Sequence, residues 1–476
     1  MTKWVSGVAF LAAAGGLFAG GCSASSGGGS GVDSGGNGGS GNNGGSGAEG
    51  GFGAFGGSGG QIDGGGGSGG DPSTCEGAAA ARSYFGCDFY PTVVSNAVWS
   101  IFDYAVVIAN TNDSPVNVEV TFPGSGTLAT ETVPAYGVSK IFLPWIPALK
   151  GGDADECGSS PFLNASIRGQ GAFHLTTDKP VSLYQFNALE YQGAGGPPGK
   201  SWNNCPGDRI CAQYLTAVGC FSFSNDASLL VPSTAWTGNY RIMGPKGQST
   251  YFAVTGKTDG TQVEVLLSST ASVAAGAGIP ATGPGGSFTF TVNANEVVEV
   301  VTNGDTDLSG TLVRTTDGNV IQVITGSPCI TTPYGAAACD HIEETVFPAE
   351  TLGAHYFVTV PTGPNGNVVG HVVRIFGNQD GTTLSYPGGQ PNGAPTTINA
   401  GQVVDIGQVA QDFEITGDKE FAVGSFMLGG SLLDPNGAVG EQKGDPSMSF
   451  ATAVEQYRKQ YVFLAPTTTT SAMSTS

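Results

Sequence analysis

The densest group of reactive side chains in this 476-residue chain is the stretch CDHIEE at Cys339–Glu344. Carboxylates beside an imidazole are the groups that general acid–base catalysis and metal binding use. A hydrolase would need two or three of Asp340, His341, Glu343 and His355 to converge on one another. Related stretches elsewhere in the chain keep only an aspartate, which favours a solvated acidic connector instead. We therefore predict that the protein is not an enzyme, with a secreted hydrolase as the alternative.

The triplet Gly256-Lys257-Thr258 matches the end of a phosphate-binding loop. Such a loop also needs a glycine five residues earlier, where this chain has Tyr251, and a helix after the triplet. Instead DGTQVEV follows, an Asp-Gly turn into an alternating strand. We therefore predict a hairpin and no nucleotide. The net charge of −21 also opposes nucleic-acid binding, because there is no basic surface to replace the counterions of the phosphates.

Two further stretches suggest binding chemistry. NGDTD places oxygen atoms on alternate residues, at Asn303, Asp305 and Asp307, as calcium loops do. It lacks the remaining ligands of a 12-residue calcium loop, so an Asx-type turn is the alternative, and otherwise we expect no cofactor. Trp202 lies in a Gly/Pro-rich insertion at 193–211, and such loops often carry binding residues.

The amino terminus indicates export. Lys3 precedes a short apolar run that ends in AGGC at Cys22, which is the plan of a secretory signal peptide over residues 1–22. The small residues before Cys22 resemble the lipobox of bacterial lipoproteins, so Cys22 is the predicted lipidation site, and an ordinary signal peptide is the alternative. By resemblance to bacterial sorting rules, Ser23 favours the outer membrane.

The other cysteines are even in number, which in an exported chain predicts disulfides. No pair has the C-x-x-C spacing typical of zinc sites. The local pairs are Cys75 with Cys87 and Cys329 with Cys339, and the pairing of the other four stays open. The disulfide candidates are Cys75, Cys87, Cys157, Cys205, Cys211, Cys220, Cys329 and Cys339.

Residues 23–73 are about half glycine and contain no Lys or Arg. They cannot bury enough apolar surface to offset chain entropy, so we predict a disordered linker. From Thr74 onward, short runs rich in Val, Thr, Phe and Tyr alternate with Gly, Asn, Asp and Pro. That texture predicts many short strands and tight turns.

The strand-rich region repeats a plan three times. Each repeat begins with a predicted hairpin around an aspartate. A stretch similar to TVPAYG follows, and then a stretch similar to TTDK. A strand rich in aromatic residues connects one repeat to the next. The shared positions are Asp113, Asp259 and Asp380 in the hairpins, Asp178, Asp317 and Asp418 in the third stretch, and Tyr240, Tyr356 and Tyr461 in the aromatic strand.

A repeat of this length has the size of a β-sandwich. We therefore predict an all-β protein with about three tandem β-sandwich-like repeats after the disordered Gly-rich tether. The repeated region spans 74–466, with units at about 83–230, 231–346 and 347–466, and 467–476 is predicted to be a disordered tail.

An ordered series of motifs resembles the amino-terminal domain of the IgG-Fc-binding protein family. The motifs include SNDASLLVPSTAWTGNY, CDHIEETVFPAETLGAHY and KPVSLYQFN. The chain resembles a bacterial member of this family that is exported as a lipoprotein. The resemblance implies an extracellular binding or adhesion module and brings no catalytic residues. We expect a surface-anchored adhesion lipoprotein of the bacterial cell envelope. Its expected partner is an unknown protein or glycan, bound through loops of the repeats. A structural role in the cell envelope is a further alternative function for the chain.

Overall fold

The computed structural model describes residues 72–153, 163–203, 205, 220, 222, 224–336, 339–363, 366–436, 443–458 and 461–464. It is an all-β structure with three short α-helices in the described residues. None of these helices has the length and apolar character that a membrane crossing requires. The helices and 3-10 turns are α1 (Cys75–Ala81), α2 (Pro147–Lys150), α4 (Gly430–Leu433), η2 (Ser233–Ala235), η3 (Ala349–Thr351) and η4 (Val454–Gln456).

Unit 1 is built around one long strand, β7. The first half of β7 pairs with β1 and β3, and its second half pairs with β2 and β8. One strand therefore belongs to two sheets that pack together. The strands are β1 (Gly86–Phe89), β2 (Tyr104–Ala109), β3 (Val116–Phe122), β4 (Gly126–Val133), β5 (Val138–Leu143), β6 (Ile167–Gln170), β7 (His174–Asn187) and β8 (Asp226–Leu230).

Unit 2 repeats this pairing, with the long strand divided into two. β16 pairs with β9 and β12, and β17 pairs with β11 and β18. The extra strand β6 of unit 1 pairs with β14, which joins the two units. The strands are β9 (Asn239–Arg241), β10 (Gly247–Gln248), β11 (Tyr251–Gly256), β12 (Thr261–Leu266), β13 (Ser287–Val292), β14 (Glu296–Val301), β15 (Asp305–Thr306), β16 (Leu312–Thr315), β17 (Ile321–Ile330) and β18 (Asp340–Thr345).

Unit 3 has the same connections around β24. The first half of β24 pairs with β19 and β21, and its second half pairs with β20 and β25. The strands are β19 (Gly353–Val358), β20 (His371–Gly377), β21 (Thr382–Ser385), β22 (Thr397–Ile398), β23 (Val403–Val409), β24 (Phe413–Met427) and β25 (Ser447–Phe450).

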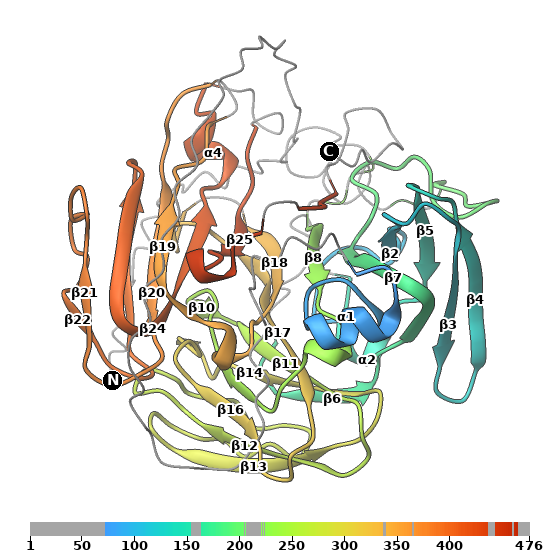
Figure 1. The fold of residues 1–476 in the computed structure, drawn as a ribbon, viewed down its shortest axis with the longest axis horizontal. Coiled ribbons are helices and arrows are strands. Elements are labelled where there is room, and N and C mark those ends of the chain that lie inside the picture. Colours follow the sequence, from blue (N-terminus) through green and yellow to red (C-terminus); the bar gives the residue numbers. More distant parts are fainter. Residues whose placement is uncertain are drawn as a thin grey trace, which may run out of the picture.

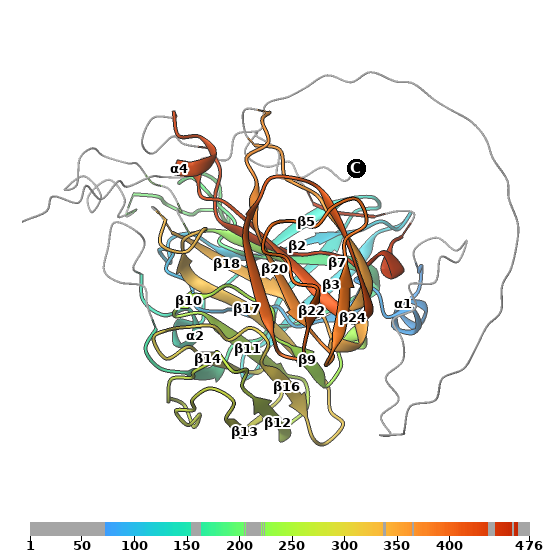
Figure 2. The same cartoon turned by 90° about the vertical axis from the view of Figure 1, so that its left-hand side faces the viewer.

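The units surround the strands β8, β18 and β25. Figure 1 shows unit 1 on the right, unit 2 below and unit 3 on the left, with those three strands near the middle. Figure 2 shows unit 3 in front of the others. Two apolar clusters cross the unit boundaries, because one contains residues of units 1 and 2 and the other contains residues of units 2 and 3. The three units therefore share their cores.

The strands near the centre differ from the outer ones in burial. Every residue of β2, β11, β14, β17 and β20 is buried. In contrast, β3, β12 and β21 alternate between buried and more exposed positions. The central strands of the inner sheets are therefore buried on both faces, whereas β5 and β23 at the edges of those sheets and the outer strands reach solvent.

The aspartates of the third repeated stretch have one structural role in all three units. Each carboxylate accepts a hydrogen bond from a backbone N–H near the start of the strand that follows the first repeated turn, which is β3 in unit 1, β12 in unit 2 and β21 in unit 3. A carboxylate that binds a backbone N–H satisfies a donor at the point where strand pairing ends. The pairs are Asp178 with Asn117 (2.9 Å), Asp317 with Gln262 (2.8 Å) and Asp418 with Thr383 (2.7 Å).

In units 2 and 3, the aspartate of the first repeated turn binds a second turn of the same unit. Asp259 accepts from the N–H of Ala294 at 3.0 Å, and Asp380 accepts from the N–H of Ala400 at 3.1 Å. At Gly256 a Cβ atom would collide with the Asn293 carbonyl, so only glycine permits this close approach. The predicted strands β11 and β12 flank the triplet that resembled a phosphate loop. The predicted hairpin is wrong, because β11 pairs with β14 and β17 whereas β12 pairs with β13 and β16, so the turn carries the chain from one sheet to another.

The repeated tyrosines also share a bond. Each hydroxyl accepts from the backbone N–H three residues earlier, and Tyr240 and Tyr356 also donate to the carbonyls of Ile321 and Phe421. The chain end then returns to unit 1, where the N–H of Val462 donates to the Tyr84 hydroxyl at 3.0 Å. The accepting bonds join Thr237 to Tyr240 (3.3 Å), Gly353 to Tyr356 (2.9 Å) and Arg458 to Tyr461 (2.8 Å).

Candidate functional site

The acidic stretch that suggested catalysis is a buried strand. The prediction of a solvated connector is wrong, because β18 packs between β8 and β25, and Asp340, His341 and Glu343 are at most 2% exposed. The sequence was misleading because charged residues usually lie in contact with solvent. Here buried side-chain amides of unit 1 bind the carboxylate of Glu343.

Glu343 is the centre of a polar layer between units 1 and 2. It accepts from the Gln185 amide at 3.0 Å and from the Asn187 amide at 2.5 Å. Its backbone N–H donates to Asp226 at 2.8 Å. A buried carboxylate is tolerated when such donors satisfy it, so these bonds fix the junction between the two units.

Two of the candidate catalytic residues approach each other, but in the interior and not at a surface that a substrate could reach. His341 Nε2 lies 3.7 Å from Glu343 Oε2, and both side chains are fully buried. His355 instead lies in β19, where it contacts Glu414 of β24 at 2.8 Å. The pair of His341 and Glu343 therefore has no contact with solvent.

Two carboxyls in the polar layer resist ionisation. Burial raises the pKa of Asp226 well above its ordinary value, and the charge of Glu343 adds to this effect. Burial likewise raises the pKa of Glu299, with a smaller contribution from Glu343. The neutral form is favoured because an ionised carboxylate loses its hydration in the interior.

Lys257 of the apparent phosphate triplet joins units 1 and 2. Its ammonium donates to Asp88 at 2.7 Å and to Ser233 at 2.6 Å, and Asp88 also contacts His174 at 2.5 Å. Burial alone would raise the pKa of Asp88. Hydrogen bonds from His174, Lys257 and Ser233 outweigh burial and hold that pKa well below its ordinary value.

The predicted calcium ligands do not face a common point. Asp307 binds Arg374 of unit 3 in a largely buried ion pair. Asp305 pairs with Gln248 across β10 and β15, and Asn303 is exposed. No three His, Cys, Asp or Glu side chains of the described residues are grouped to hold a metal. Asp307 would have to leave Arg374 before it could bind a cation.

The described cysteines form three disulfides. The two local pairs are present, Cys75 with Cys87 and Cys329 with Cys339, and a third bond joins Cys205 to Cys220. Cys22, Cys157 and Cys211 lie outside the described residues. The third bond closes the insertion that carries Trp202, which is half-buried against Phe102 with 5.4 Å between ring centroids.

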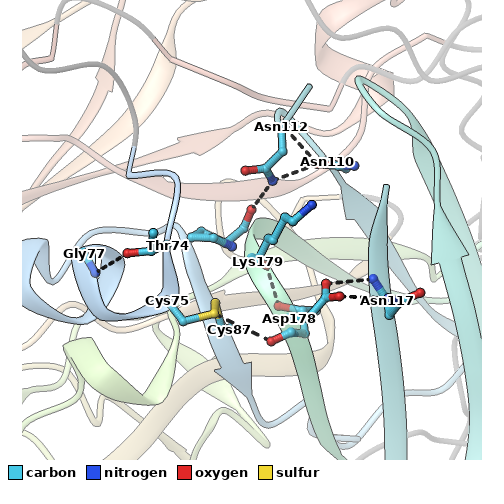
Figure 3. The surroundings of a disulfide bond; sticks show 11 residues. Thr74, Cys75, Gly77, Cys87, Asn110, Asn112, Asn117, Asp178 and Lys179 are labelled. Carbon is cyan, nitrogen blue, oxygen red and sulfur yellow. Dashed lines mark hydrogen bonds between the residues drawn. A yellow bond between two sulfur atoms is a disulfide. The ribbon is translucent and has the colours of Figure 1, made fainter. Parts of the chain in front are cut away.

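The outer sheet of unit 1 contains an open hollow of about 630 Å³. Three side chains cross it in a row: the Thr132 hydroxyl donates to Asn117 Oδ1 at 3.1 Å, and the Asn117 amide donates to Asp178 at 2.8 Å. Figure 3 shows Asp178 and Asn117 bound in this way beside the disulfide at Cys75. The lining is Asn117, Val118, Glu119, Thr130, Glu131, Thr132, Thr176, Thr177 and Asp178.

The lining contains three carboxylates and no Lys or Arg. Glu119 accepts from the Thr127 hydroxyl at 2.6 Å, and no cation opposes it across the sheet, where Thr176 is its neighbour. Enclosed, mostly apolar pockets suit small ligands, whereas this hollow is open and polar. Its shape and charge therefore suit a basic surface of a larger partner.

We did not predict this site from the sequence. A usable signal was present in GTLATETV, because β4 has Ala129 and Glu131 at the positions where its counterpart SFTFTV has phenylalanine. A strand without large apolar residues at a sheet edge is exposed on both faces over most of its length.

Comparison with known proteins identifies the family. A sequence model of the IgGFc binding protein family matches residues 226–475, more than half of the chain. The chain belongs to the IgGFc binding protein family. The family match begins at β8 and covers units 2 and 3, so most of unit 1, including the hollow, precedes it.

A search of curated proteins finds no match. Among solved structures, the chain has a weak similarity to a domain described as "Biofilm associated protein - BSP domain". The two are 10% identical, with a TM-score of 0.12, over 78% of this chain and 67% of that chain. At this TM-score, the likeness carries no argument about fold or function.

Proposed function

We propose that this protein is a cell-surface adhesion protein that binds a protein partner without catalysis and without a cofactor. Membership of the IgGFc binding protein family is the observation that carries the proposal. The shared cores of the three units support it, because a rigid scaffold holds an exposed surface in one shape.

The protein is held at the envelope by its amino terminus. In this proposal Cys22 carries a lipid in the outer membrane, and residues 23–73 form a tether. A random coil of that length spans on the order of 40 Å, so the repeats would stand clear of the membrane. The disulfides fit an oxidising extracellular setting.

The partner binds at the outer sheet of unit 1. Glu119 and Asp178 give this surface negative charge, and the whole chain carries a net charge of −21. A basic protein surface would be attracted by this field, and its association would weaken as salt is added.

The test is a binding screen with the purified full chain. Immunoglobulin Fc is the first probe, because the family is named for it, and a panel of extracellular proteins and glycans follows. Saturable binding to a protein that weakens at high salt supports the proposal. Binding to glycans alone, or association of the chain only with itself, contradicts it and favours the glycan-binding or structural alternative.

A further inference from the structure

A lysine and an aspartate meet at the base of the unit 1 insertion. Lys200 Nζ lies 2.5 Å from Asp103 Oδ2, and the side chains are 11% and 19% exposed. Asp103 directly precedes β2, whereas Lys200 belongs to the insertion, 97 residues later. An amine and a carboxyl at contact distance are the two reactants of an amide bond.

A second carboxyl completes the group. Glu190 is 8% exposed, and its Oε2 accepts from the backbone N–H of Asp103 at 2.8 Å. A Cβ atom on Gly196 would lie 3.1 Å from Asp103 Oδ2 and 3.3 Å from Glu190 Oε1, and it would press against the Lys200 side chain. The three functional side chains therefore surround one glycine, whose φ of +87° also favours glycine.

Aromatic rings shield the amine. Lys200 Nζ lies 4.4 Å from the centre of the Trp202 ring, and that ring packs on Phe102. The Lys200 side chain is only 11% exposed, so little water can separate Nζ from the Asp103 carboxyl.

Glu190 has the acidity that a proton carrier needs. Burial raises its pKa to about 7, and a hydrogen bond with Asp103 adds to this effect. At neutral pH such a carboxyl is present in both forms, so it can donate a proton and take one back.

We propose that Lys200 and Asp103 form an intramolecular isopeptide bond, with Glu190 as the proton carrier. A proton first passes from the Lys200 ammonium to the Asp103 carboxylate, which leaves a neutral amine and a carboxylic acid. Nζ then attacks Asp103 Cγ, and the C–N bond forms. Glu190 donates a proton to the departing hydroxyl, the C–O bond breaks, and one water leaves. Glu190 recovers its proton from Nζ, so the net change is loss of one water, and no oxidant is needed.

The contact between Lys200 and Asp103 favours formation of the amide bond. Groups held at contact distance behave as if they were extremely concentrated, with effective molarities of about 10⁵–10⁸ M for well-oriented pairs. The product is a neutral amide, which removes the cost of keeping two charges in a poorly hydrated place.

The bond would fasten the insertion to the sheet. Lys200 is two residues before Trp202, and Cys205 follows within the same insertion. The insertion would then be closed by the disulfide with Cys220 and joined covalently to the start of β2. A loop held in this way cannot be pulled from the domain without breaking a covalent bond.

The chain contains its own control pair. Lys257 Nζ and Asp88 Oδ2 are likewise in contact, at 2.7 Å. Here, however, Ser233 and His174 also form hydrogen bonds with the Asp88 carboxylate. Asp88 is held ionised there, and an ionised carboxylate is a poor acceptor for an amine. We expect no bond at this second pair.

Peptide mapping of the full chain tests the proposal. After reduction and digestion with trypsin, an isopeptide bond joins peptide 83–140 to peptide 169–209, because modified Lys200 resists cleavage. The joined product should weigh one water less than the two peptides together. Peptide 83–140 should carry no link to Lys257. Recovery of free 83–140, 169–200 and 201–209 from the wild-type chain overturns the proposal.

Two variants separate chemistry from folding. Lys200→Arg keeps the positive charge beside Asp103 and should abolish the joined peptide. Glu190→Gln keeps the shape of the side chain and should slow bond formation about a hundredfold or more, as loss of a proton carrier does. Formation at the wild-type rate in Glu190→Gln contradicts the role of Glu190. Because the wild-type mass decides whether the bond exists, misfolding of a variant leaves that test intact.

Discussion

Units 1 and 2 have the same strand pairing but different outer faces. In unit 2, Glu264 faces Arg314 across the sheet, and the two form an ion pair at 2.6 Å. In unit 1, Glu119 faces Thr176 at the corresponding place and has no cation opposite it. The repeat therefore preserves the residues that hold the fold, while the surface charge differs from one copy to the next.

The edge strands differ in the same way. Phe288 and Phe290 of β13 point into the core of unit 2, whereas β4 has Ala129 and Glu131 at the positions with the same pairing. The edge strand of unit 1 consequently has smaller and more polar side chains on this face than the edge strand of unit 2.

The largest expected effect concerns the contact between the two units. Glu343→Ala removes the acceptor of two buried amides, on Gln185 and Asn187, and should cost about 2–5 kcal/mol of unfolding free energy. Denaturant unfolding measures the change. Glu414→Ala, which removes a half-exposed carboxylate, is the control and should cost less than about 1 kcal/mol. Equal losses in both variants would show that the polar layer does not hold the units together.

The tyrosine bond should stabilise unit 2 but has no counterpart in unit 1, where Phe89 occupies the place of Tyr240. Tyr240→Phe leaves the Ile321 carbonyl and the Thr237 N–H without this partner, so we expect a loss of about 1–2 kcal/mol. Thermal unfolding measures it. No change in stability would mean that the aromatic ring at this position is sufficient in unit 2, as the Phe89 ring is in unit 1, and that the hydroxyl contributes nothing.

The capping aspartates should matter equally in the two units. Asp178→Ala and Asp317→Ala each remove an acceptor from a strand N–H, and each should cost about 1 kcal/mol. Denaturant unfolding of both variants checks this. A much larger loss in one unit would contradict the equivalence of their folds.

Acid should weaken the link between Asp88 and Lys257. Because the pKa of Asp88 is lowered by folding, its stabilisation is present above the ordinary aspartate pKa of about 4 and is lost as the pH falls below it. Asp88→Asn should therefore reduce the melting temperature at pH 7 and make it less sensitive to acid. A variant that keeps the full acid sensitivity would show that other carboxyls cause it.

The smallest effect is expected at the ion pair of unit 2. Arg314→Ala removes a half-exposed partner of Glu264 and should change the unfolding free energy by about 0.5 kcal/mol or less. Urea unfolding checks the value. A loss of several kcal/mol would mean that this pair supports the sheet and is not only a feature of its surface.

Local patterns in the sequence predicted the strands and turns, because alternation and glycine act locally. Gly260 turns the chain with a φ of +74°, and the alternation in VNVEVTF marks a strand with one buried face. The all-β class and the disulfide Cys75–Cys87 follow from such features. Contacts between units could not be predicted in this way, because they join residues far apart in the chain.

The candidate site shows the same limit. The charges of Asp340 and Glu343 suggested solvent, but Gln185 and Asn187 arrive from another unit to bind Glu343. The partner of Lys257 was equally hidden, because Asp88 lies 169 residues away in the chain. The hollow depends on the pairing of β3, β4 and β7, and the sequence does not state which strands are neighbours.

The most direct test exchanges the two outer faces. Thr176→Arg gives unit 1 the cation that unit 2 has opposite its glutamate, and Arg314→Thr is the reciprocal control. Affinity of the full chain for the protein partner found in the screen should fall at least about tenfold in Thr176→Arg, as at an interface hot spot, and stay unchanged in Arg314→Thr. Unchanged affinity in Thr176→Arg, or loss in Arg314→Thr alone, would contradict the assignment of binding to unit 1.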